Sequence, residues 1–468
     1  MNTTPETSFF SPKQASFWVG LFFISALFLS LSLILGMSPL MAPGVFVVLA
    51  SFAFLKRPLV LLGILITIRM TLDYLSETIH ISIGSNVSMS LSQALGVFLI
   101  LLSVTIFALY IKKMLHFPLW KPFALLGLFG LVSATYSVDP LQSIEEIARL
   151  VSIFSISFLA FISVTDTTKM KQALLILLFS SILPVMESVR QVALNIGLTD
   201  SSVDVPRIYG TFAHTNVLAL YLFSLFAIMT FYFFLPPSKN DTARTERSAL
   251  LPFVLICYGF IAIFLLLLTY TRVAWVALFL YVLILALWRS RIFLFPLIAI
   301  PAILFVFSPT IHDRILESFQ TKPDSSIVWR QEIWHDVTTK LRIDGRRLYG
   351  TGLDTFSSYA YSLRGTSLGS TDSHNDFVKF YVEGGVIGLT VFLLYLTLIG
   401  SEIRTLWTLP LAYRRLVVAF SLYSGLLLLS SLTDNIYKDT PLQWIFFILL
   451  GALIAFRQLP EFKHTSAR

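Results

Sequence analysis

Long apolar runs alternate with short polar segments along almost the whole chain. Most of these runs contain roughly 17 to 24 residues, the length of α-helix that crosses a hydrocarbon core about 30 Å thick. A transmembrane β-barrel would instead show strands of about ten residues in which apolar and polar positions alternate. The pattern therefore predicts an all-α integral membrane protein.

The apolar runs predict a polytopic bundle of about 12 to 14 transmembrane helices. The run at 58–70 is short, and a re-entrant segment is the alternative for it. The expected spans lie near residues 17–35, 39–55, 58–70, 92–110, 118–135, 145–164, 172–190, 214–235, 249–268, 272–288, 291–308, 376–399, 413–433 and 440–456.

One polar interval, residues 309–375, is much longer than the others. Loops of more than about 15 residues usually have a function or a structure of their own. Within this loop, "DSSIVWRQEIWHDVTTKLRI" places Arg330, Trp334, Val337 and Leu341 at helical spacing on one face. We therefore expect helices in the loop, the main one amphipathic.

Basic residues indicate how the spans are oriented. With the N-terminus in the cytoplasm, the inward segments carry about nineteen Lys and Arg and the short outward loops about five. Because cytoplasmic loops are enriched in these residues, both termini are expected in the cytoplasm. The long loop 309–375 then lies on the outer side.

The composition supports a membrane protein. The chain is 56% hydrophobic and 13% charged, with a mean hydropathy of +0.80, whereas a soluble domain has about 25% charged residues. The net charge of +8 is explained by Lys and Arg in the expected cytoplasmic loops. No nucleic-acid partner is therefore expected. With Cys257 as the single cysteine, no intrachain disulfide can form.

The first polar motif, "RIYGTFAHTN", covers residues 207–216 at the outer end of a predicted span. Gly210 indicates a turn. Arg207 lies outside against the charge bias, where it either meets lipid phosphate at the interface or binds a substrate. His214 and Asn216 begin the next span and could cap that helix or take part in chemistry.

The second motif, "TYTRVAW" at residues 269–275, separates two apolar runs with almost no loop. Arg272 therefore lies at or just inside the outer membrane boundary, where a charge costs a few kcal/mol unless it is paired or hydrated. Such an arginine is a functional candidate. The alternative is a side chain that extends to the headgroups beside the interfacial Trp275.

The third motif, "STDSHNDFVKFYVEGG" at residues 370–385, opens the span at 376–399. Its "SHND" fits a capping box with Ser373 as the N-cap and Asp376 three residues later. His374 would then lie in the first helical turn, where the helix dipole disfavours the imidazolium. A neutral imidazole can act as a general base; the alternative is a histidine that belongs only to the cap.

Glu383 lies deeper in the same predicted span and is followed by Gly384 and Gly385. Glycines in a span allow neighbouring backbones to approach closely. A carboxylate at this depth needs a charged partner or water.

Two outward arginines and a histidine on one membrane face indicate chemistry on a lipid-linked diphosphate. The planar guanidinium of Arg207 or Arg272 matches phosphate oxygens. His374 could deprotonate a hydroxyl that attacks the carbon bearing the diphosphate. No set of His, Asp and Glu has convincing metal-ligand spacing, so no metal and no cofactor are expected.

These motifs resemble the O-antigen ligase and O-antigen polymerase superfamily of bacterial envelope glycosyltransferases. The chain has Thr215 and Val273 where the family often has proline and glycine. The resemblance covers roughly residues 200–400 and rests on Arg207, Gly210, Thr211, Phe212, His214 and Asn216; on Thr271, Arg272, Ala274 and Trp275; on Gly350, Gly352 and Phe356; and on His374, Asn375, Glu383, Gly385 and Gly388.

The resemblance implies a glycan donor on undecaprenyl diphosphate, used at the periplasmic face of the bacterial inner membrane. It implies inverting transfer without a metal, with Arg207 and Arg272 on the diphosphate and His374 activating or orienting the acceptor hydroxyl. Secondary candidates for the site are Arg330, His214, Asn375 and Glu383.

The expected organisation is an N-terminal transmembrane bundle (1–200), a catalytic region (201–400) that includes loop 309–375, and C-terminal helices with a cytoplasmic tail (401–468). The acceptor could be lipid A core, as for a ligase, another lipid-linked repeat, as for a polymerase, or a protein. The arginine pair and histidine favour the ligase-like function.

A transporter of lipid-linked sugars and a receptor or scaffold are the competing classes. A transporter would place ionisable groups near the midplane and show repeat symmetry, whereas these motifs cluster at the outer surface and no internal repeat is seen. A receptor or scaffold would not need arginines at the ends of spans. We therefore expect an enzyme.

Overall fold

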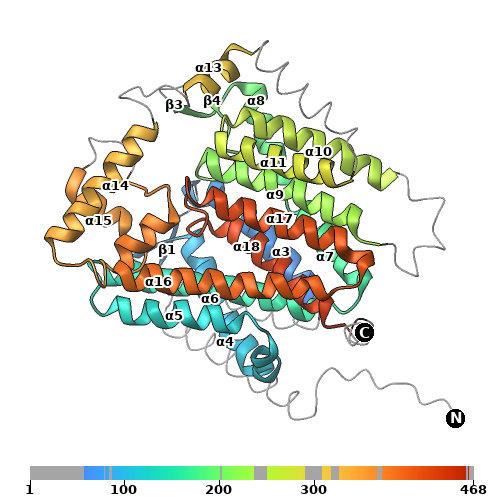
Figure 1. Cartoon of the computed structure of the whole chain (residues 1–468), viewed down its shortest axis with the longest axis horizontal. Helices are drawn as coiled ribbons and strands as arrows, with labels where there is room; N and C mark the ends of the chain where they lie inside the picture. The colour runs from blue at the N-terminus through green and yellow to red at the C-terminus, as the bar shows by residue number, and fades with distance from the viewer. Residues whose placement is uncertain are drawn as a thin grey trace.

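The computed structural model describes residues 57–78, 80–83, 87–200, 203–236, 250–289, 308–317, 326–365, 371–459 and 462 (Figure 1). These residues form a bundle of long apolar helices with two short antiparallel β-hairpins, β1–β2 and β3–β4. The elements are α3 (Pro58–Thr78), β1 (His80–Ile83), β2 (Val87–Ser90), α4 (Leu91–His116), α5 (Trp120–Ala134), α6 (Pro140–Ser163), α7 (Thr167–Phe179), α8 (Ile182–Leu194), β3 (Leu198–Asp200), β4 (Val203–Arg207), α9 (Thr215–Phe234), α10 (Leu250–Leu268), α11 (Arg272–Arg289), α13 (Pro309–Glu317), α14 (Ser326–Ile343), α15 (Phe356–Arg364), α16 (Asp376–Thr405), η3 (Leu406–Thr408), η4 (Leu411–Tyr413), α17 (Arg414–Ser430) and α18 (Thr440–Arg457).

The protein is a polytopic membrane protein. Within the described residues, 8 helical stretches are long and apolar enough to cross a membrane. Three shorter apolar helices add to them: Pro58–Thr71, Trp120–Ala134 and Arg272–Trp288. The prediction of an α-helical membrane bundle is confirmed for this part of the chain, and the two short hairpins are additions to it.

The predicted spans between 58 and 288 and between 376 and 456 coincide with α3 to α11 and α16 to α18, and the expected span at 172–190 is divided into α7 and α8. The spans expected at 17–35 and 39–55 lie outside the described residues, as does the one at 291–308 apart from its last residue.

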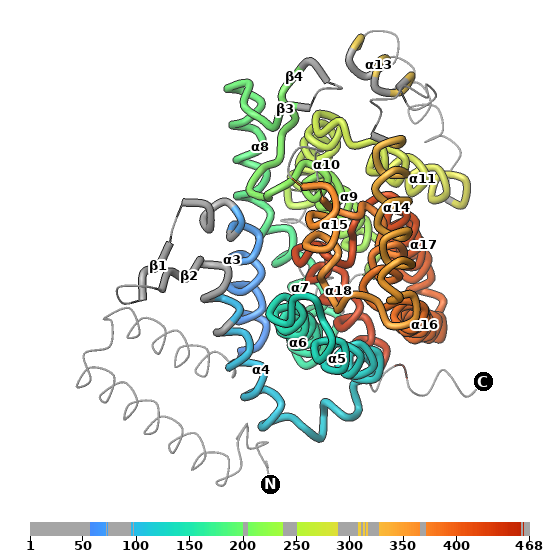
Figure 2. Tube along the Cα trace, turned by 90° about the vertical axis from the view of Figure 1, so that its left-hand side faces the viewer, coloured from blue at the N-terminus to red at the C-terminus, as the bar shows by residue number. Residues whose placement is uncertain are grey.

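Helices α6 and α18 pack side by side at the centre of the bundle (Figure 2). Nearly every residue of α18 is buried, including Trp444, as expected of a helix that is apolar on all sides. Ser157 of α6 donates from Oγ to the Phe447 carbonyl at 2.8 Å. A Cβ at Gly451 would lie 2.3 Å from the Ser157 carbonyl oxygen, so glycine is required where these two backbones meet.

Helices α14 and α15 pack together beside the bundle, on the left in Figure 1. They share a second hydrophobic core with α16, formed by Ile333, Val337, Leu341, Phe356, Tyr359, Ala360 and Val382. The amphipathic helix predicted in the long loop is therefore confirmed as α14, with Val337 and Leu341 on its buried face and Trp334 packed against it.

Helix α16 is broken at Gly385, which has φ 62° and ψ −155°. The loop between α14 and α15 lies against this break. Thr351 N donates to the Val382 carbonyl at 3.1 Å and Gly352 N to the Glu383 carbonyl at 2.8 Å. These bonds satisfy carbonyls that a broken helix leaves without partners.

Glycine is needed on both sides of this contact. At Gly350 (φ +74°) a Cβ would lie 2.3 Å from the Glu383 carbonyl carbon. At Gly385 a Cβ would lie 2.3 Å from the Leu348 carbonyl carbon. The contact joins the α14–α15 unit to the bundle.

Candidate functional site

The polar motifs meet at one end of the bundle, which we call the site face. Here α9, α11 and α16 begin and α10 and α17 end. Contacts between segments distant in sequence define it: Arg207 bonds to Thr269, and the ring of His214 lies beside that of His374.

Arg207 is buried at the end of β4, with 8% of its surface exposed. Its Nε donates to the Thr269 carbonyl at 2.9 Å. Its Nη2 donates to Thr271 Oγ1 at 3.1 Å and to Asn216 Oδ1 at 3.3 Å. Because Thr269 and Thr271 flank the α10–α11 turn and Asn216 begins α9, this one guanidinium joins three elements of the site face.

Arg272 is the first residue of α11 and directly follows Thr271, which bonds to Arg207. Its side chain is half-buried. Tyr270 at the centre of this turn has φ 52°, a left-handed conformation that lets the chain reverse with almost no loop. The turn therefore places both predicted arginines on the same side of the bundle.

Gln191 of α8 fixes the turn that follows Arg207. Its Oε1 accepts from Tyr209 N and Gly210 N, both at 2.9 Å, and its Nε2 donates to the Gly210 carbonyl at 2.9 Å. Gly210 has φ +60°, so the turn predicted there is confirmed. Thr211 Oγ1 donates to the Met70 carbonyl of α3 at 2.6 Å.

His214 is the N-cap of α9, and its Nδ1 accepts from Asn216 N at 3.4 Å. Although part of this residue is exposed, the surrounding protein lowers the pKa of His214 by desolvation, helped by His374 and Arg207 and opposed by Asp434. The ring is therefore neutral at pH 7. Since Nδ1 accepts, the ring proton lies on Nε2.

The predicted cap of α16 is wrong by two residues. The N-cap is Asn375, whose Oδ1 accepts from Phe377 N at 2.9 Å and Val378 N at 3.1 Å. Ser373 instead donates to Asn435 Oδ1 at 2.6 Å. Asparagine and serine cap about equally well, and the bond to Asn435 takes Ser373 out of that position.

His374 therefore precedes the helix instead of lying in its first turn. It has φ 45°, a left-handed conformation that is uncommon for residues other than glycine and is often found at functional sites. Its ring centroid lies 6.4 Å from that of His214 and 6.0 Å from that of Trp329 on α14.

Asp434, in the loop between α17 and α18, faces His374. Its Oδ1 lies 3.5 Å from His374 Nδ1, an ion-pair distance. Burial acts to raise the pKa of Asp434, but contact with His374 and the charge of Arg330 outweigh it and lower the pKa. The group is thus a carboxylate at neutral pH. With Nδ1 turned toward Asp434, Nε2 is the His374 nitrogen that can exchange a proton with a substrate.

The segment before α16 is held from several directions. Trp334 Nε1 of α14 donates to the Ser373 carbonyl at 2.6 Å. Asp372 pairs with Lys438 and accepts from Ser357 Oγ at 3.0 Å. The α14–α15 unit and the 434–438 loop therefore enclose His374 on two sides.

An ion pair on α6 between the buried Glu146 and the half-buried Arg149 supports the loop that carries Asp434. Arg149 Nε donates to Glu146 Oε2 at 2.6 Å, and Arg149 Nη2 donates to the Tyr437 carbonyl at 2.6 Å. Charged groups inside a membrane bundle are costly unless paired. Here the pair holds the loop at the Tyr437 carbonyl, while Tyr437 N donates to Asp376 Oδ2 at 3.1 Å.

Glu383 lies away from the histidines. It is completely buried, and it pairs with Lys379 Nζ at 2.8 Å, which supplies the partner predicted for it. Lys379 also pairs with Asp354 at 3.0 Å, and Phe356 N donates to Glu383 Oε1 at 3.2 Å. These contacts fix the start of α15 to α16, so Glu383 supports the α14–α15 unit.

The structure thus brings together Arg207, His214 and His374, with Arg330 acting on the adjacent Asp434 and Asn375 capping α16. Sequence reasoning missed Asp434, Gln191 and Arg149. The available signal for Asp434 was the polar segment "DNIYKD" between two apolar runs. Among the described residues, no group of three or more His, Cys, Asp and Glu is arranged to hold a metal ion.

The family model described as O-antigen ligase matches residues 257–393. The matched segment includes Arg272 and His374 and ends before Asp434. Arg207 and His214 precede it. A search of curated proteins gave no match.

Proposed function

Because residues 257–393 make this chain a member of the O-antigen ligase family, we propose that it transfers a glycan from undecaprenyl diphosphate to an acceptor hydroxyl at the periplasmic face of the bacterial inner membrane. The observation that carries this proposal is the meeting of Arg207, His214, His374 and Asp434 at one end of the bundle. Lipid A core is the acceptor we favour.

In the proposed reaction, His374 Nε2 takes the proton from the acceptor hydroxyl. The hydroxyl oxygen attacks the anomeric carbon of the donor from the face opposite the diphosphate. The bond between that carbon and the diphosphate oxygen breaks, and its electron pair leaves with the lipid diphosphate. The product is a new glycosidic bond with inverted configuration.

The charges around His374 suit this step. Asp434 stabilises the imidazolium that forms when His374 accepts the proton. Arg207 and Arg272 bind the diphosphate, whose negative charge grows as the bond breaks. His214 is neutral and carries its proton on Nε2, so it can donate a hydrogen bond to a phosphate oxygen.

Joining of lipid-linked repeats, as in a polymerase, is the second candidate function, because it uses the same donor and the same residues. Transport of lipid-linked sugars receives less support, since the cluster lies where helices begin and end instead of at mid-membrane. We propose that the catalytic region covers residues 201–400, and that both termini are cytoplasmic.

The test is transfer by the purified full-length protein in lipid nanodiscs. The donor is undecaprenyl diphosphate carrying a defined glycan, offered with lipid A core or with a second lipid-linked repeat, and EDTA is present throughout. We expect glycan on lipid A core without added metal. Elongated lipid-linked glycan would instead show that the protein acts as a polymerase and not as a ligase. No transfer to either acceptor would contradict the proposal.

Replacing Asp434 with asparagine is expected to reduce kcat by about 10²-fold or more, because the amide keeps the shape but loses the charge that stabilises the imidazolium. The KM for the donor should stay within about twofold, since Asp434 acts through His374 and not on the diphosphate. The measurement is steady-state transfer in nanodiscs, with Asp166→Asn at the exposed start of α7 as control. An unchanged kcat would remove Asp434 from the mechanism.

Replacing Arg272 with lysine is expected to reduce transfer about 10- to 100-fold, because lysine keeps the charge but lacks the planar fork that binds two phosphate oxygens. Arg415→Lys, at the exposed start of α17 on the other face of the bundle, is the matched control. Full activity of the Arg272 variant would mean that this side chain only reaches to lipid headgroups.

A further inference from the structure

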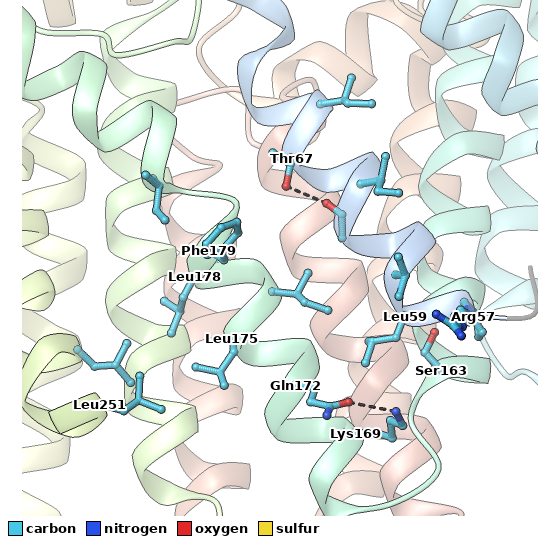
Figure 3. A pocket seen from close by; sticks show the side chains of 18 of the residues that line it. Arg57, Leu59, Thr67, Ser163, Lys169, Gln172, Leu175, Leu178, Phe179 and Leu251 are labelled. Atoms are coloured by element: carbon cyan, nitrogen blue, oxygen red, sulfur yellow. Dashed lines mark hydrogen bonds between the residues drawn. The ribbon is translucent and has the colours of Figure 1, made fainter. Parts of the chain in front are cut away.

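A large cavity lies between α3, α7, α8 and α10 (Figure 3), and neither His214 nor His374 lines it. Its volume is about 1300 Å³, more than the roughly 300–1,000 Å³ of a pocket for a drug-sized ligand. Most of its lining is apolar, with Ile64, Phe179 and Val254 among the residues. This shape and lining suit a long apolar molecule.

The charged groups of the cavity gather at one end. Figure 3 shows Arg57, Ser163, Lys169 and Gln172 together there. Lys169 Nζ donates to Gln172 Oε1 at 3.1 Å, and Arg57 is exposed. Asp166, beside this end, accepts from Lys169 N as the N-cap of α7. The cavity therefore has a cationic opening and an apolar interior.

The length of the cavity matches one leaflet of a bilayer. Along α3 its lining runs from Arg57 to Ile68, about 16 Å at about 1.5 Å per residue. Along α7 it runs from Lys169 to Phe179, about 15 Å. Half of a hydrocarbon core about 30 Å thick is about 15 Å. The cations thus lie at headgroup level when the apolar part fills one leaflet.

That leaflet is the one opposite the site face. Met70, further along α3, accepts from Thr211 of the site turn, and α10 ends beside Thr269, which bonds to Arg207. The cavity contacts the other halves of these two helices, through residues such as Leu59 and Leu251.

We propose that this cavity binds one anionic phospholipid from the leaflet opposite the site face. The acyl chains lie between α3, α7, α8 and α10, and the phosphate lies at Arg57 and Lys169. Charge selects the ligand, since two cations at headgroup level favour a lipid with net negative charge over a zwitterionic one. A bound lipid fills the space between α3 and α10, two helices whose other halves contact the site turns.

The test measures lipid retained by the purified full-length protein, by native mass spectrometry after exchange into dioleoylphosphatidylglycerol or dioleoylphosphatidylcholine. We expect one phosphatidylglycerol per chain and much less phosphatidylcholine. Replacing both cations (Arg57→Gln with Lys169→Gln) should weaken retention roughly 30-fold. Lys112→Gln with Lys113→Gln, exposed cations outside the cavity, should leave it unchanged.

A second pair of variants tests the apolar part. Val254→Trp fills the cavity, whereas Val276→Trp lies on an exposed face of α11 outside it. Both should elute as folded protein in size-exclusion chromatography, and only the first should lose the lipid. Equal retention of the two phospholipids, or unchanged retention in the cation or Val254 variant, would each overturn the proposal.

Discussion

Replacing His374 with alanine is expected to slow glycan transfer by about 10² to 10⁴, the usual cost of removing a general base. Its imidazole has an ion-pair contact to Asp434 through Nδ1, which leaves Nε2 for the acceptor. The variant should still reach the membrane, because its side chain caps no helix; Asn375 has that role. The measurement is transfer per mole of purified protein in nanodiscs.

His335→Ala is the control for this prediction. His335 is exposed on α14, in the same α14–α15 unit, and the same change of residue there should leave the rate within about twofold. If the His374 variant kept full activity while bound to donor and acceptor, the base would have to be another group. His214, whose ring lies beside it, would be the next candidate.

Replacing Lys379 with methionine is expected to destabilise the protein by about 3–5 kcal/mol, because it leaves the fully buried Glu383 without its cation. Asp354 loses the same partner. The loss of stability should appear first in the contact between the α14–α15 loop and the break in α16. Hydrogen exchange of the Gly352 and Phe356 amides, both bonded to Glu383, measures it.

The matched variant is Lys379→Met combined with Glu383→Gln. The neutral amide removes the unpaired charge at position 383, although that of Asp354 remains, and its oxygen can still accept from Phe356 N. This double variant should recover much of the lost stability, because replacing both partners of a buried ion pair with neutral residues usually costs much less than removing one partner. Equal destabilisation of single and double variants would show that the charge of Glu383 is not what Lys379 compensates.

The membrane architecture could be predicted from the sequence because the length of each apolar run can be compared directly with the thickness of the hydrocarbon core. Helix α14 was also predictable, since Val337 and Leu341 repeat at helical spacing and are buried. The turn at Gly210 was predictable because few other residues accept φ +60°. These features depend on local chemistry.

The completed site was not predictable in the same way. Asp434 reaches His374 across the α16–α17 hairpin, and Gln191 reaches Gly210 from a different helix. Such pairings depend on which helices become neighbours, and apolar runs of similar length do not encode that. The cap of α16 was misassigned for the same reason, because the distant Asn435 decides the position of Ser373.

The most direct test of the account is a cryo-electron microscopy structure of the protein in a nanodisc with undecaprenyl-diphosphate glycan bound to the inactive His374→Ala variant. We expect the diphosphate beside Arg207 and Arg272, with the anomeric carbon facing the position that His374 leaves. A diphosphate bound elsewhere, for example at Arg57 and Lys169 in the opposite leaflet, would contradict the proposed site.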